Sequence, residues 1–201
     1  MCAESRKIFR FLTTIQEIKR IIDKINELKS RNNKTSIIFD IISRIGYLIY
    51  WSFDNLYVIS ALRKFPKNQQ LKYFFISKTG WFFANLISIL KNLYDIFLLK
   101  NSKILNENSF EYESFGNNNI NNDNDNNNNK SDSNFNSELD NNNAFLNKIN
   151  EEIYFHKKEI LARFCELLIS MHFLEVPERF FNIRFTDGML SIAGIISSCI
   201  I

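Results

Sequence analysis

The chain is poor in the residues that break helices and in those that build metal or catalytic centres. Its 201 residues include only 5 glycines, 2 prolines, 3 cysteines and 2 histidines. So few glycines and prolines leave little material for tight turns, and the sequence therefore favours long helices over many short strands. Three widely spaced cysteines form neither a disulfide framework nor a CxxC metal motif, which indicates a reducing compartment.

The same scarcity argues against catalysis. His156 and His172 lack the spacing of a metal-binding pair, and the glycines form no phosphate-binding loop. Cys165 and His172 are seven residues apart on one predicted helix. No third group is placed there to orient a base, so a core thiol beside a polar residue is the favoured interpretation. We therefore expect no enzyme activity, no cofactor and no metal.

What the chain does contain is apolar material and unevenly distributed charge. It is 45% hydrophobic with 20 phenylalanines, enough for a single helical domain over residues 1–201. Residues 1–34 hold nine basic and four acidic side chains, whereas residues 101–150 hold three basic and eight acidic ones. The basic end suits an anionic surface and the acidic stretch suits solvent. Because the basic charges are interleaved with acids and no nucleic-acid-binding motif is present, we expect no nucleic-acid partner.

Residues 4–29 are predicted to form a basic amphipathic helix that is too polar to cross a bilayer alone. Apolar residues recur along it at gaps of three and four. This apolar stripe can pack in a core, lie on a membrane surface or pair in a coiled coil. The membrane interpretation assigns to the lipid the stripe Ile8, Phe11, Ile15, Ile18, Ile22 and Ile25. It assigns to anionic headgroups the side chains of Arg6, Lys7, Arg10, Lys19, Arg20 and Lys24.

A second helix is predicted over residues 36–65, where Pro66 marks its end. One side is broadly apolar, and the other carries Arg44, Asp54 and Asn55. Asp40 is four residues before Arg44, a spacing at which the two can pair. A buried polar network is a commoner use of such a face than a ligand site.

A third helix is predicted over residues 70–100, with a thin polar line of Lys78, Asn85 and Asn92 at heptad spacing. Residues 101–143 are predicted to be an inserted Asn-rich disordered loop, because ten of the thirteen residues 117–129 are asparagine. A fourth helix is predicted over residues 144–174.

The C-terminal stretch 186–201 is the most membrane-like segment. It includes 14 uncharged residues, which is short of the ~20 that an independent crossing needs. By that strict criterion no segment is a transmembrane helix, and a partly buried hairpin fits as well as a full crossing. Small residues at gaps of three, three and four predict a face on which another helix packs, within the chain or between copies. That face comprises Gly188, Ser191, Gly194 and Ser198.

Four motifs, in this order, resemble the peroxin-eleven family of peroxisomal membrane proteins. They are Ser-Arg-Lys-Ile-Phe-Arg (5–10), Ile-Ser-Arg-Ile-Gly-Tyr (42–47), Phe-Asp-Asn-Leu (53–56) and the glycine-containing apolar end that closes with Ser197-Ser198. The family has a similar RKxxR start, an Arg-x-Gly element, a downstream Asp-Asn and a similar C-terminal end. The order of these short motifs is a stronger argument than any one of them.

The resemblance implies a protein of the peroxisomal membrane that promotes membrane elongation, fission and peroxisome proliferation. The expected fold is all-α, with membrane-associated helical hairpins, an amphipathic N-terminal helix and a short hydrophobic C-terminal helix. Expected partners are anionic lipid, further copies of the chain in a homo-oligomer and membrane-fission proteins. Helix packing is assigned to Arg44, Gly46, Asp54, Asn55, Gly188, Ser191, Gly194 and Ser198.

Two alternative functions stay open. The hairpins could form an oligomeric pore for small metabolites, lined by Arg44, Asp54, Lys78 and Asn85. The chain could also be a soluble helical scaffold that binds a partner helix through the apolar stripe.

Overall fold

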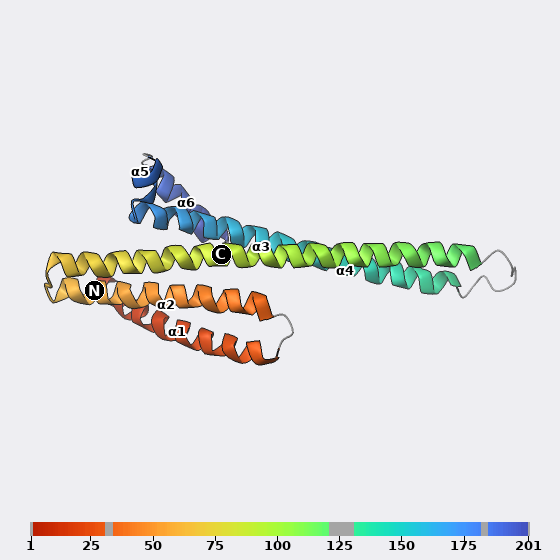
Figure 1. Ribbon diagram of the computed structural model, residues 1–201, viewed down its shortest axis with the longest axis horizontal. Helices are drawn as coiled ribbons and strands as arrows, with labels where there is room; N and C mark the ends of the chain where they lie inside the picture. The colour runs from red at the N-terminus through yellow and green to blue at the C-terminus, as the bar shows by residue number, and fades with distance from the viewer. Residues whose placement is uncertain (1, 31–33, 121–130, 182–184, 201) are drawn as a thin grey trace. The chain divides into compact units, whose positions relative to one another are not determined.

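The computed structural model describes the backbone of residues 2–30, 34–120, 131–181 and 185–200, and the side chains of 12–30, 34–106, 143–179 and 185–200. Over these ranges the chain is all-α, as the sequence predicts, and contains no strand. The helices are α1 (Cys2–Ser30), α2 (Lys34–Leu62), α3 (Lys67–Ile120), α4 (Ser131–Phe173), α5 (Val176–Phe181) and α6 (Asp187–Ile200) (Figure 1).

The turn between α2 and α3 follows from local chemistry. Lys64 has a φ of 54°, and the Phe65 amide donates to the Ser60 carbonyl at 2.9 Å, which together cap the end of α2. Pro66 cannot continue a helix, but its carbonyl accepts the Gln69 amide at 2.9 Å and so starts α3. The boundary that the sequence predicts at Pro66 is therefore confirmed.

The asparagine-rich region differs from the prediction. α3 continues to Ile120 instead of ending at 100, and α4 begins at Ser131 instead of at 144. Helix therefore covers 101–120 and 131–143, and residues 121–130 lie outside the described residues. An established helix gains one hydrogen bond for each residue it adds, and asparagine costs at most about 0.7 kcal/mol relative to alanine, so extension into polar sequence is inexpensive.

The chain divides into two compact units whose boundaries lie within α3 and α4. The first unit comprises residues 1–92 and 158–201, and the second comprises 93–157. In the second unit Ile149 and Ile153 are buried, and the Lys103 ammonium donates to the Asn150 side-chain oxygen at 3.2 Å. A single domain over 1–201 stays a prediction.

In the first unit, α2 and α3 cross where small residues face each other. A Cβ added to Gly46 would lie 2.9 Å from the Ala84 Cβ and 3.1 Å from the Ala84 Cα. A Cβ added to Gly80 would lie 3.1 Å from the Gly46 carbonyl oxygen. The Ser43 hydroxyl also donates to the Ala84 carbonyl at 3.0 Å. Small side chains at this crossing let the two backbones approach closely, as in membrane helix pairs.

In the first unit, buried polar side chains outnumber buried apolar ones, and many large apolar side chains are exposed. The largest fully buried side chains of the described residues are all polar, namely Asn85, Asn92, Ser60, Ser77 and Ser170. Large apolar side chains of α2 are exposed instead, including Ile38, Ile42, Ile45, Ile49, Leu56 and Ile59. A water-soluble protein buries such residues, so this arrangement indicates an apolar solvent.

Among the described residues, two helices are long and apolar enough to cross a membrane: α2 and the Lys67–Asn106 part of α3. Only 11% and 17% of the residues in their most apolar windows are buried, whereas a core helix of a soluble protein would be mostly buried. Neither helix has the uncharged run of ~20 residues that the strict sequence criterion requires, because Asp54 interrupts α2 and Lys78 interrupts α3. Both side chains are buried inside the first unit.

Candidate functional site

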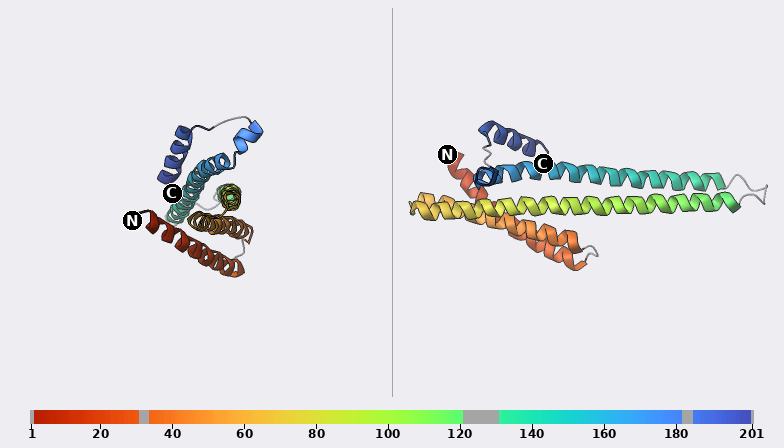
Figure 2. Two further views of the ribbon diagram at one scale, coloured as in Figure 1. Left: turned by 90° about the vertical axis from the view of Figure 1, so that its left-hand side faces the viewer. Right: turned by 45° about the horizontal axis from the view of Figure 1, so that its top comes forward.

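The position of α1 explains how its apolar stripe is used in the structure. α1 lies beside α2 in each view of the molecule (Figures 1 and 2). The stripe residues Ile15, Ile18, Ile22 and Ile25 are 42–53% exposed, whereas Glu17 on the opposite side is only 4% exposed. Core packing is therefore not the use of the stripe over these residues. The side chains of Arg6, Lys7, Ile8, Arg10 and Phe11 lie outside the described residues.

Polar contacts hold α1 against α2. The Arg44 guanidinium donates to the Glu17 carboxylate at 3.3 Å, and the Asn55 amide donates to the Thr14 hydroxyl at 3.0 Å. Further along α1, the Lys24 ammonium lies 3.4 Å from the Asp40 carboxylate. Arg44 and Asn55 thus share a face of α2, as their spacing predicts, and that face meets α1.

A cavity of about 610 Å³ lies among α1, α2, α3 and α4 within the first unit. Its charged lining residues are four cations and four acids, namely Arg20, Arg44, Lys91, Arg163, Glu17, Asp40, Glu159 and Glu166. Its other lining residues include Thr13, Ser43, Tyr47, Tyr50, Trp51, Trp81, Ser88 and Asn92. A space this polar inside an apolar exterior is the most chemically distinctive feature of the described chain.

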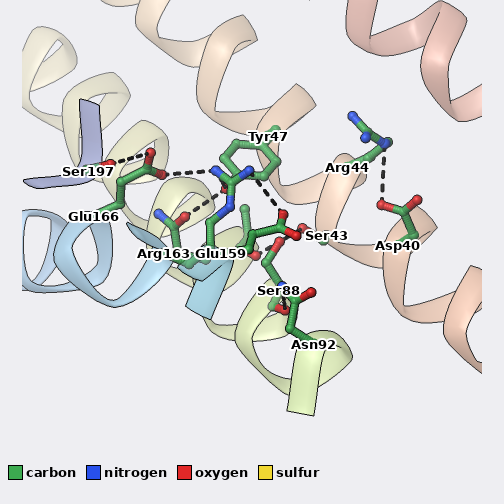
Figure 3. Close-up of polar contacts among 12 residues, drawn as sticks. Asp40, Ser43, Arg44, Tyr47, Ser88, Asn92, Glu159, Arg163, Glu166 and Ser197 are labelled. Carbon is green, nitrogen blue, oxygen red and sulfur yellow. Dashed lines mark hydrogen bonds and ion pairs between the residues drawn. The ribbon is translucent and has the colours of Figure 1, made fainter. Parts of the chain in front are cut away.

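Two arginines form the centres of the charged lining (Figure 3). Arg44 of α2 lies between Glu17 and Asp40, with its Nε 3.4 Å from the Asp40 carboxylate. This ion pair confirms the pairing that the four-residue spacing predicts. The Nε of Arg44 nevertheless makes no hydrogen bond within the part of the chain that the structure describes.

Arg163 of α4 is the second centre. It donates to the Tyr47 hydroxyl at 3.0 Å and to Glu166 at 3.3 Å, and lies 3.7 Å from Glu159. The Ser197 hydroxyl of α6 donates to Glu166 at 3.2 Å, which joins the C-terminal helix to this cluster. The Arg163 Nε, like that of Arg44, makes no hydrogen bond to a described residue.

Aromatic rings form another part of the cavity wall. The Tyr50 ring lies 4.7 Å from Trp51 and is stacked at 5.4 Å on Trp81. Lys78 is buried beside this wall, with its ammonium 4.8–5.4 Å from the rings of Tyr50, Phe74, Trp81 and Phe173. Four rings around one ammonium hold this charge by cation–π attraction in a desolvated place.

Comparison with known proteins identifies the family. The model of Peroxisomal biogenesis factor 11 (PEX11) matches residues 2–200. The chain belongs to the PEX11 family. It is 32% identical over 208 residues to Peroxisomal membrane protein PMP30B of Candida boidinii, an alignment that covers 98% of this chain and 70% of that protein. No solved structure matches the chain. The chain is therefore a peroxisomal membrane protein, as the motif order predicts.

The motifs that carried the PEX11 resemblance differ in where the structure places them. Gly46 lies at the α2–α3 crossing, Asp54 is buried, and Arg44 lines the cavity. The small-residue face of α6 is exposed instead. A Cβ added to Gly194 would meet no described atom within 4 Å, and Ser191 and Ser198 donate only to carbonyls of their own helix. Among the described residues no other helix lies within 4 Å of a Cβ added to Gly188 or Gly194, so helix packing by this face stays a prediction.

The sequence did not reveal the part of the cavity that α1 and α4 contribute. The sequence assigns no role to Glu17, Arg163 or Glu166. The one available signal was local, because Glu159, Arg163 and Glu166 have the four- and three-residue gaps of helical ion pairs. That spacing does not reveal that Tyr47, 116 residues away in sequence, receives the Arg163 hydrogen bond.

Proposed function

We propose that this PEX11-family protein elongates the peroxisomal membrane before fission, and that α1 acts as a wedge in one leaflet. The carrying observation is that the apolar stripe of α1 is exposed while its polar side is held by α2. A helix inserted into one leaflet spreads the headgroups on that side only, and this favours positive curvature.

The charges and the anchors support the same proposal. Lys19 and Arg20 are exposed on α1, and each cation near anionic lipid contributes about 1 kcal/mol to binding. α2 and α3 are long and apolar enough to keep the chain in the bilayer. The exposed small residues of α6 suit contact between copies in a homo-oligomer, which would let many wedges act together.

The test uses the full chain reconstituted into anionic liposomes and electron microscopy of the vesicles. Ile15→Asp with Ile18→Asp places two charges on the exposed stripe without touching the buried Glu17 side. We expect this variant to lose tubulation. Tyr154→Asp with Phe155→Asp is the matched control, because these α4 residues are 61% and 64% exposed and lie outside the stripe. Tubulation that survives the stripe substitutions, or that is lost equally in the control, would show that α1 is not the wedge.

The pore alternative has less support. Of the four residues expected to line it, Arg44 lines the cavity, whereas Asp54, Lys78 and Asn85 are buried and do not. Conductance across planar bilayers that disappears in Arg44→Ala would favour the pore over the wedge.

A further inference from the structure

We propose that residues 159–174 of α4 form a third membrane-embedded helix, whose outer face contacts the hydrocarbon of the bilayer. The segment carries Glu159, Arg163 and Glu166, and it is not one of the two helices of the described chain that are apolar enough to cross a membrane by composition. The proposal goes beyond α1 acting as a wedge and does not depend on it.

Contacts at two points place this segment beside the middle of α2. The Arg163 guanidinium donates to the Tyr47 hydroxyl at 3.0 Å. Ten residues further along each helix, the centroids of the Phe173 and Tyr57 rings lie 6.1 Å and 5.6 Å from that of the Phe74 ring. α4 therefore runs parallel to α2 between these points (Figure 1). Because α2 is long and apolar enough to cross a membrane, this part of α4 lies at membrane depth as well.

The charged side chains of the segment face the interior of the first unit. Glu159, Arg163 and Glu166 all line the cavity (Figure 3). Arg163 lies 3.3 Å from Glu166 and 3.7 Å from Glu159. Glu166 also accepts the Ser197 hydroxyl of α6 at 3.2 Å. Ionisable residues of membrane helices characteristically pair with one another and face the bundle interior or a polar cavity, so these charges are compatible with a lipid-covered helix.

The outward side of the segment is apolar. Over residues 159–174, where the structure describes every side chain, the exposed residues are Leu161, Phe164 and Phe173, at 49%, 49% and 40%. His172 is half-buried beside the Phe173 ring. This exterior has the same character as the exposed isoleucines of α2, and hydrocarbon suits both better than water does.

Exposed charges mark both ends of the apolar exterior. Lys157 and Lys158 precede it, and Glu175 follows it. The 16 residues between Lys158 and Glu175 extend about 24 Å along the helix axis. The long lysine side chains can reach toward the headgroups from a backbone that lies deeper, so this length is close to the ~30 Å of bilayer hydrocarbon.

Spin labels on single cysteines test the proposal in the full chain, reconstituted into liposomes of phosphatidylcholine and phosphatidylglycerol after the native cysteines are replaced by serine. Phe164→Cys carries the label on the outward side of the segment. Phe145→Cys is the matched control, because Phe145 is 44% exposed on the same helix and lies about 28 Å further along its axis. Ile45→Cys is the reference on α2, also 44% exposed. Circular dichroism verifies that each variant stays folded.

The readout is the ratio of the collision rates of the label with oxygen and with a polar nickel chelate. Oxygen concentrates in hydrocarbon and the chelate is excluded from it, so we expect Phe164→Cys to match Ile45→Cys and to exceed Phe145→Cys by at least about fivefold. A ratio at Phe164→Cys as low as that at Phe145→Cys overturns the proposal. An equally high ratio at Phe145→Cys also overturns it, because the lipid would then extend past the lysines that bound the segment.

A second measurement needs no substitution and so does not depend on the cysteine-free chain folding. A lipid-soluble diazirine in the same liposomes reacts on illumination with side chains that hydrocarbon covers, and mass spectrometry locates the products. We expect label on Leu161 and Phe164 of the unmodified chain and none on Phe145. Label on α2 and α3 without label on Leu161 or Phe164 would overturn the proposal.

Discussion

Close packing of α2 on α3 can be tested by adding a single methyl group. In Gly46→Ala the new Cβ would lie 2.9 Å from the Ala84 Cβ and 3.1 Å from both the Cα and the backbone nitrogen of Ala84. Carbon atoms in ordinary contact are about 3.5–4.0 Å apart, so the two helices must separate by roughly 0.5–1 Å at this point. Two of the three nearest atoms belong to the backbone, and no side-chain rotation can relieve the overlap.

The magnitude follows from two opposing terms. Replacing glycine with alanine within a helix stabilises it by about 1 kcal/mol, and overpacking a close contact costs about 1–3 kcal/mol. Gly194→Ala supplies the first term alone, because no described atom lies within 4 Å of the added methyl. We therefore expect Gly46→Ala to be less stable than Gly194→Ala by about 1–3 kcal/mol, or about 5- to 150-fold in the unfolding equilibrium constant.

The assay is unfolding in dodecyl maltoside micelles by added sodium dodecyl sulfate, followed by circular dichroism. Gly46→Leu should unfold at a lower detergent fraction than Gly46→Ala, because its larger side chain needs a wider separation. Equal midpoints for Gly46→Ala and Gly194→Ala would mean that the α2–α3 crossing is not close at this position.

Three further outcomes follow from charged and thiol groups. Lys78→Gln should lower stability by about 2 kcal/mol in the same assay, since it removes the cation from its four rings; a loss under about 0.5 kcal/mol would contradict that role. Cys165 is buried, so N-ethylmaleimide near pH 7 should modify the exposed Cys199 at least about tenfold faster than it modifies Cys165. Peptide mass spectrometry would measure the two rates, and equal rates would contradict the burial of Cys165. The Lys24 ammonium donates to Glu27, which raises the Lys24 pKa above its ordinary 10.5. The Lys24 ion pair therefore contributes its full stability below pH 10.5, and this contribution is lost as the pH rises through the higher pKa of the folded state. The unfolding midpoint should fall over that alkaline range in the unmodified chain, and Lys24→Gln should abolish this fall.

The sequence was sufficient for the cores of the long helices and for which residues share a face, because the 3.6-residue period depends on local geometry alone; it was not sufficient for the asparagine-rich extensions of α3 and α4, where no apolar period marks the helix. It could not show which way a face points. The spacing of Ile15, Ile18, Ile22 and Ile25 is the same whether a protein core or lipid covers them. Only the packed structure shows that these side chains are exposed. The cavity was beyond reach for a related reason, since Arg163 meets Tyr47 only after α2 and α4 pack together.

The polar line of Lys78, Asn85 and Asn92 also determines how α3 can be turned about its own axis. An apolar interior would let a helix rotate among packings of similar energy, because dispersion contacts have little directional preference. Turning α3 by one residue, about 100°, would carry these three side chains out of the unit and toward the lipid. Asn85 would also lose the hydroxyl of Tyr47, which donates to its side-chain oxygen at 2.7 Å. The seven-residue spacing of these polar groups thus favours one rotation of α3 about its axis. That rotation determines which isoleucines and phenylalanines of α3 contact the bilayer.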